Sequence, residues 1–97
     1  MQVRVRFFTF LREATGKKEE TLQFEEGEKV TVDLTLKTLS KRYGKTFSEY
    51  VYDIGTGEVK GFLQFFVNGQ SVSALKGLDT ELRNEDVLAI IPPVGGG

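Results

Sequence analysis

The sequence predicts a single domain of the α+β class, in which one main helix packs on one face of a mixed β-sheet. Segments of alternating or continuous apolar residues, typical of strands, occur near both ends and in the second half of the chain. One segment, 31–43, instead has its apolar residues at helical spacing. The chain has 97 residues, of which 39% are hydrophobic, which is enough for one modest core.

The first predicted strand covers residues 2–7, where polar and apolar side chains alternate strictly. The side chains expected in the core are Val3, Val5 and Phe7. Phe8 falls on the opposite, polar face, and Phe10 would follow it there if the strand continued. An aromatic side chain on a solvated face is an interface candidate, but local packing under the next loop is an equally good interpretation for Phe10.

A helical turn, a polar loop and a second strand are predicted next. Residues 11–16 are expected to form a single helical turn that ends at Gly16. Residues 17–20 are polar and mixed in sign, so we expect a solvated turn. Residues 21–24 alternate again and predict a strand with Leu22 and Phe24 facing the core.

The main helix is predicted over residues 31–43. Its buried face is expected to contain Val32, Leu36, Leu39 and Tyr43, at spacings of four, three and four. Thr31 is a suitable N-cap, and Gly44 is placed to end the helix. The apolar residues of 47–54 predict a short amphipathic helix or a loop folded back on the core.

The second half of the chain predicts a hairpin and a final strand. Residues 61–67 predict a strand, and Asn68-Gly69 is a strong signal for a type I′ turn. Residues 70–73 would form the short return strand, and 78–82 an irregular crossing with two buried leucines. Residues 87–91 form the last predicted strand. The inward side chains expected here are Leu63, Phe65, Val67, Leu88 and Ile90.

The predicted order is strand, strand, helix, strand, short strand and final strand, which indicates a ubiquitin-like β-grasp fold over residues 1–91. A single main helix leaves the other face of the sheet uncovered. The outward apolar side chains expected on that face are Phe8, Phe62, Phe66 and Ile91. They would form a patch near the end of the final strand, where a partner protein is expected to bind.

The composition excludes several classes of function. With no cysteine and no histidine, the chain has no disulfides, cysteine nucleophile, histidine acid–base group or usual zinc site. We therefore expect no bound metal or cofactor and no catalysis by the chain alone. The net charge of −1 and the absence of a long apolar run or signal peptide predict a cytoplasmic protein without nucleic-acid or membrane partners.

The last six residues, 92–97, predict a flexible reactive tail. Two prolines give the chain a stiff exit from the final strand, and glycines without a Cβ can pass through a narrow channel. Six extended residues reach about 20 Å. A terminal carboxylate is a poor electrophile and must first be activated, and we expect this activation to give an acyl-adenylate made with ATP. It could then accept sulfur as a thiocarboxylate or an amine as an isopeptide. A frayed, inert terminus is the alternative interpretation.

The sequence resembles the MoaD family, the small subunits of molybdopterin synthase, over nearly its whole length. The resemblance rests on residues 5–8, 11–13, 39–44, 67–69, 78–80 and 86–97. The ending, Pro92-Pro93-Val94-Gly95-Gly96-Gly97, matches the family's Pro-Pro-Val-x-Gly-Gly. The segment 45–60 is longer and more aromatic than in the shortest members, which leaves room for a different partner surface.

The resemblance implies a sulfur carrier with three partners: an adenylating enzyme related to ubiquitin activators that uses ATP, a persulfide sulfur donor and a large catalytic subunit like MoaE. Gly97 would carry the adenylate and then the thiocarboxylate used to build the dithiolene of molybdopterin. Gly95 and Gly96 would thread into the partner's active site. The remaining residues expected to contact partners are Phe8, Arg12, Phe62, Phe66, Ile91, Pro92, Pro93 and Val94.

Other functions share the same activation step. A ubiquitin-like modifier would be joined to lysines of other proteins through Gly97. A sulfur carrier could also serve thiamin or tRNA thiolation, although the Pro-Pro-Val ending and residues 11–13 favour the molybdopterin branch over the thiamin one. A plain interaction module with an inert tail would be unaffected by loss of Gly96 and Gly97.

Overall fold

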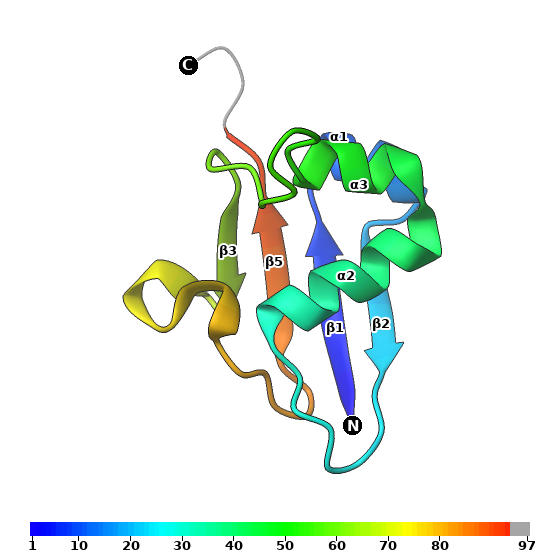
Figure 1. Ribbon diagram of the computed structural model, residues 1–97. Coiled ribbons are helices and arrows are strands. Elements are labelled where there is room, and N and C mark those ends of the chain that lie inside the picture. The colour runs from blue at the N-terminus through cyan, green and yellow to red at the C-terminus, as the bar shows by residue number, and fades with distance from the viewer. Residues whose placement is uncertain (94–97) are drawn as a thin grey trace.

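The computed structural model describes residues 1–93, and within them five strands form a mixed sheet in the order β2-β1-β5-β3-β4 (Figure 1). The strands are β1 (Gln2–Phe7), β2 (Glu19–Gln23), β3 (Gln64–Val67), β4 (Gln70–Ser71) and β5 (Val87–Ile91). β1 and β5 are parallel, whereas the other neighbouring strands are antiparallel. The last strand therefore lies inside the sheet, between β1 and β3, and the chain leaves for its C-terminus from that position.

The helical segments are α1 (Phe10–Thr15), α2 (Val32–Tyr43), α3 (Lys45–Val51), η1 (Val72–Ala74) and η2 (Gly77–Asp79). In Figure 1, α2 and α3 cover one face of the sheet. The hydroxyl of Thr31 accepts a hydrogen bond from the Leu34 amide at 3.1 Å, as an N-cap does. Gly44 ends α2 and begins α3 with φ of 77°, a conformation that glycine adopts without strain.

The core lies between the sheet and these helices. The largest fully buried side chains are Phe7, Phe47, Leu11, Leu22, Leu36, Leu39, Leu88, Ile90, Val3, Val5, Val30 and Val32. The predicted inward residues of the first, third and final strands are all buried. Asn68 and Gly69 both have positive φ, 50° and 86°, so the turn predicted from these two residues is confirmed. The observed architecture is the predicted α+β, ubiquitin-like β-grasp fold.

Three sequence-based expectations about local structure were wrong. Glu19 and Glu20 belong to β2 and not to a solvated turn, and Glu20 is buried with its carboxylate paired to Lys17 in the preceding loop and to Arg42 and Tyr43 of α2. Ile54 is 82% exposed, because α3 ends at Val51 and the following loop turns away from the core. The return strand after the hairpin ends at Ser71, where the chain enters η1.

Candidate partner-binding surface and tail exit

The open face of the sheet, opposite α2, contains apolar side chains from its central strands. Cross-strand partners point to the same face of a sheet, and the register pairs Phe66 with Ala89. Ile91, two residues after Ala89, shares this face. All three are half-buried, whereas their strand neighbours Phe65 and Ile90 point into the core.

Phe8 joins this face at the end of β1. Its ring lies beneath the guanidinium groups of Arg6 and Arg12, at 5.5 and 5.4 Å from the ring centroid to each Cζ. Arg6 projects from β1 on the open face, next to Ala89 of β5. We call the set Phe8, Phe66, Ala89 and Ile91 the open-face patch.

Arg12 has a structural contact that its sequence position did not indicate. Its Nε donates a hydrogen bond to the Phe7 carbonyl oxygen at 2.9 Å, which fixes α1 against the end of β1. Since the same guanidinium lies over Phe8, Arg12 positions an aromatic ring of the open-face patch. Its expected contact with a partner stays a prediction.

Phe62 does not belong to the open-face patch, contrary to expectation. Its ring packs against Tyr50 of α3 at 6.0 Å between centroids, and Tyr50 in turn lies 4.7 Å from Phe10. The expectation counted Phe62 as an outward residue of a strand over 61–67, but β3 begins only at Gln64, so Phe62 lies in the preceding loop. Phe10 has both predicted properties, because it packs locally on Tyr50 and is still 39% exposed.

The exit of the tail lies beside the open-face patch. Ile91 pairs with Gln64 at the end of β5, Pro92 is buried and Pro93 is exposed. A proline has no amide hydrogen and cannot extend the hydrogen bonds between strands, so the two prolines end β5 at this end of the sheet. Val94, Gly95, Gly96 and Gly97 lie outside the described residues, and their expected roles stay predictions.

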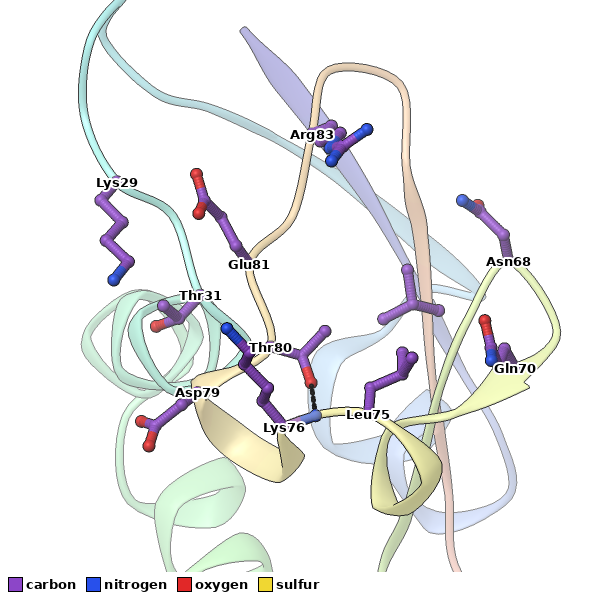
Figure 2. A pocket seen from close by; sticks show the side chains of 11 residues that line it. Lys29, Thr31, Asn68, Gln70, Leu75, Lys76, Asp79, Thr80, Glu81 and Arg83 are labelled. Carbon is purple, nitrogen blue, oxygen red and sulfur yellow. Dashed lines mark hydrogen bonds between the residues drawn. The ribbon is translucent and has the colours of Figure 1, made fainter.

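A groove of about 970 Å³ lies at the other end of the sheet (Figure 2). Asn68, which lines the groove, donates its amide hydrogen to the Val87 carbonyl oxygen at 2.9 Å, so the groove lies near the start of β5. Cationic and acidic side chains both line it: Lys29, Lys76 and Arg83 together with Asp79 and Glu81. No sequence pattern indicated this groove, because its walls come from three separate loops. Its mixed charge offers no arrangement suited to activating a carboxylate.

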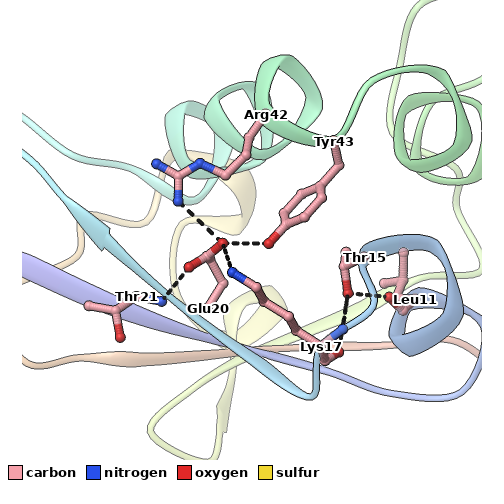
Figure 3. Close-up of polar contacts among 7 residues, drawn as sticks. All are labelled: Leu11, Thr15, Lys17, Glu20, Thr21, Arg42 and Tyr43. Atoms are coloured by element: carbon pink, nitrogen blue, oxygen red, sulfur yellow. Dashed lines mark hydrogen bonds and ion pairs between the residues drawn. The ribbon is translucent and has the colours of Figure 1, made fainter.

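A buried carboxylate joins β2 to the end of α2 (Figure 3). Glu20 accepts a short hydrogen bond from the Tyr43 hydroxyl, and it pairs with Lys17 Nζ and Arg42 Nη1, each at 3.2 Å. Burial opposes ionisation of Glu20, but the three donors together lower its pKa below the ordinary value. Burial and the neighbouring carboxylate raise the pKa of Tyr43 to about 12. All three donors bind this one carboxylate, which indicates that the cluster has a structural role.

The described residues contain neither a metal-binding cluster nor a helix that could span a membrane. Within residues 1–93, no three histidine, cysteine, aspartate or glutamate side chains are grouped as metal ligands would be. No helix in this part of the chain is long and apolar enough to cross a membrane. The features that remain for function are the open-face patch, the exposed aromatic side chains near it and the exit of the tail.

This geometry agrees with the family that the chain matches. Residues 5–97 match the ThiS family, so the match includes the sheet, the helices and the glycine-rich end. The chain belongs to the ThiS family. Its similarity to MoaD proteins is thereby confirmed at the level of a shared family of ubiquitin-like sulfur carriers and small modifiers.

Three members of this group show how far the similarity extends. A candidate sulfur carrier protein of Archaeoglobus fulgidus is 38% identical over 72 residues, which cover 74% of this chain and 80% of that protein. Small archaeal modifier protein 3 of Haloferax volcanii is 32% identical over 97 residues, the full length of both. The solved structure of a candidate subunit 1 of the molybdopterin converting factor from Pyrococcus furiosus superposes with a TM-score of 0.73. It is 28% identical, with coverage of 97% of this chain and 99% of that one.

Proposed function

We propose that this ThiS-family chain carries sulfur as a thiocarboxylate on Gly97 and supplies it for the dithiolene of molybdopterin. The observation that carries the proposal is the position of β5. This strand ends at the edge of an open apolar face, and two prolines separate it from a terminal glycine sequence. An enzyme that binds the open-face patch would therefore have the tail within reach of its active site. The solved Pyrococcus furiosus structure supports the molybdopterin branch.

The chemistry requires three steps, and the chain itself supplies only the acyl group. In the activating enzyme, the Gly97 carboxylate attacks the α-phosphorus of ATP, which forms the acyl-adenylate and releases pyrophosphate. The terminal sulfur of a persulfide then attacks the acyl carbon, and AMP leaves. A thiol reduces the resulting acyl disulfide, which frees the thiocarboxylate and leaves a disulfide on the donor side. A MoaE-like catalytic subunit would then receive the sulfur.

The folded domain must supply the binding energy for this reaction. Ordering a residue costs about 1–2 kcal/mol of backbone entropy, so threading the tail is unfavourable by itself. Burial of the open-face patch against a partner offsets that cost, because half-buried Phe8, Phe66 and Ile91 still expose apolar surface. Phe8 is held by two guanidinium groups, which reduces the freedom that it would lose on binding.

The test is reconstitution with the adenylating enzyme, persulfide donor and MoaE-like subunit of the same organism. We expect pyrophosphate release that depends on this chain, a thiocarboxylate at Gly97 by mass spectrometry, and conversion of the molybdopterin precursor when the catalytic subunit is added. Thiocarboxylate formation without conversion of the precursor would contradict the molybdopterin assignment while leaving the carrier role intact.

A second candidate function is protein modification. Its specific support is the full-length similarity to small archaeal modifier protein 3 of Haloferax volcanii. In this case a lysine amine would attack the activated Gly97 carbonyl, lose a proton and displace AMP, which forms an isopeptide. Both functions need the same adenylate, so the two differ only in the acceptor. Branched peptides in which Gly97 is joined to lysines of other proteins would favour this function.

A further inference from the structure

A second apolar surface lies at the same end of the molecule as the tail exit. Phe10, Tyr50 and Phe62, which we call the aromatic strip, form a continuous series of ring contacts of 4.7 and 6.0 Å between centroids. They come from α1, from α3 and from the loop before β3. Phe10 and Phe62 are 39% and 46% exposed, and Tyr50 between them is half-buried. Exposed aromatic clusters of this kind are typical of protein interfaces.

The topology places the aromatic strip near the exit of the tail. Phe62 lies two residues before Gln64, which pairs with Ile91, and the tail begins immediately after Ile91. Figure 1 shows α1 and α3 at the end of the sheet from which the chain leaves. Tyr50, the central ring of the aromatic strip, comes from α3, which packs on the covered side of the sheet, so the strip is distinct from the open-face patch.

The loop that carries Phe62 is held in place by its own hydrogen bonds. Lys60 N donates to the Val51 carbonyl oxygen at 2.8 Å, and Tyr52 forms an isolated bridge with Val59. Lys60 Nζ donates to the Glu49 carbonyl oxygen at 2.7 Å and lies 5.8 Å from the centroid of the Phe62 ring. An aromatic side chain fixed in this way loses little freedom on binding, which favours a contact residue.

The length of the tail limits what can cover the aromatic strip. The four residues 94–97 span at most about 14 Å beyond Pro93. Under the proposed function, an enzyme that acts on the Gly97 carbonyl must therefore come within that distance of Pro93. At the exit of the tail, such an enzyme meets exposed apolar side chains of both the open-face patch and the aromatic strip.

We propose that the aromatic strip is a docking surface for the ATP-dependent enzyme that adenylates Gly97. This inference rests on the proposed activation of Gly97, but it holds for either fate of the adenylate. Activation is the one step common to sulfur transfer and protein modification, so a contact needed for activation serves both. The matching surface on the enzyme is expected to be apolar, with a carboxylate at its rim facing Lys60.

The test measures pyrophosphate release by the adenylating enzyme as a function of the concentration of this chain. For Phe62→Ser and Phe10→Ser, we expect KM for the chain to rise about tenfold or more with kcat unchanged, because buried aromatic anchors dominate interface energies. Leu75→Ser is the matched control, since Leu75 is 42% exposed but lines the groove at the other end. Its KM is expected to equal that of the wild type.

Each other result contradicts the inference in a recognisable way. An unchanged KM in folded Phe62→Ser and Phe10→Ser, checked by urea unfolding, would overturn the aromatic strip while leaving the proposed function standing. A defect confined to the later transfer of sulfur would show that the aromatic strip binds the acceptor enzyme instead. A wild-type dimer that both variants fail to form would show that the strip binds a second copy of this chain. A wild-type chain that releases no pyrophosphate would overturn the inference and the proposed function together.

Discussion

Glu20 links β2 to the C-terminal end of α2 through hydrogen-bond donors that lie both before and after it in the sequence. Glu20 is 9% exposed, and its carboxylate accepts from Tyr43, Lys17 and Arg42. A buried charge is costly unless it is paired, and here three donors compensate for its burial. The cluster therefore sets how β2, an edge strand, is held against the main helix.

Replacing Glu20 with Gln should destabilise the fold. The amide keeps one acceptor for Tyr43, but Lys17 and Arg42 lose the charge that they face. We expect a loss of about 1–2 kcal/mol in the free energy of unfolding at neutral pH, measured with urea. Glu19→Gln is the control, because Glu19 is exposed on the open face and its loss should cost less than about 0.5 kcal/mol. Equal stability of the two variants would contradict the structural role of the cluster.

The stabilisation by Glu20 should depend on pH. Its pKa in the folded protein is lowered below the ordinary value of about 4.3, so folding favours the ionised form. The contribution is fully present above that ordinary value and is lost as the pH falls through the lowered pKa. The difference in unfolding free energy between the wild type and Glu20→Gln should therefore shrink in acid. A difference that stays constant down to full protonation of the carboxylates would refute this assignment.

Phe8 is the residue at which the open-face patch can be tested alone. It lies outside the buried core, so Phe8→Ala should leave the fold intact. We expect its affinity for the large catalytic subunit to fall about tenfold or more, measured by calorimetry, because a positioned aromatic ring is lost. Gln23→Ala, an exposed change on β2, is the matched control. Binding unchanged within error for Phe8→Ala would exclude the patch as the docking surface.

At the scale of elements, the Asn68-Gly69 turn sets the register of β3 and β4. Gly69 has φ of 86°, a conformation in which any residue with a side chain is strained, even though the space beside its Cα is open. We expect Gly69→Ala to cost about 1–2 kcal/mol in urea unfolding. Gly61→Ala is the control, since Gly61 has open space and no positive φ. A cost at Gly69 no greater than at Gly61 would show that the turn tolerates other conformations.

Elements with strong local patterns were predictable from the sequence, and those that depend on distant partners were not. Alternation over residues 2–7 and helical spacing over 31–43 predicted β1 and α2 almost to the residue. Glu20 was assigned to a solvated turn because its partners Arg42 and Tyr43 are more than twenty positions away. Residues 47–54 were expected to form a short helix or a loop folded back on the core, but the helix ends at Val51 and Ile54 is exposed.

At the scale of the whole molecule, the path of the chain between elements decides which residues share a surface. Sequence reasoning grouped Phe62 with Phe8, but Phe62 lies in the loop before β3 and packs on α3. The open-face patch was otherwise predictable for Phe8, Phe66 and Ile91, because strand alternation fixes their side of the sheet. The groove and the aromatic strip were not, since each combines loops and helices that meet only in the folded chain.

We expect the tail to be needed for activation but not for the stability of the folded domain. The buried core of the described residues runs from Val3 to Ile90, so deleting Gly96 and Gly97 should leave the urea midpoint unchanged. The same deletion should abolish release of pyrophosphate by the adenylating enzyme, because the reacting carboxylate is moved away from the active site. Full activity of the shortened chain would support an interaction module with an inert end.

The most direct test of the sulfur-carrier function is the intact mass of the protein purified from its native cells. We predict a population in which one oxygen of the Gly97 carboxylate is replaced by sulfur, and fragmentation should locate the change to the last residue. An unmodified terminus, found together with branched Gly97–lysine peptides among cellular proteins, would contradict the carrier role and make the chain a protein modifier.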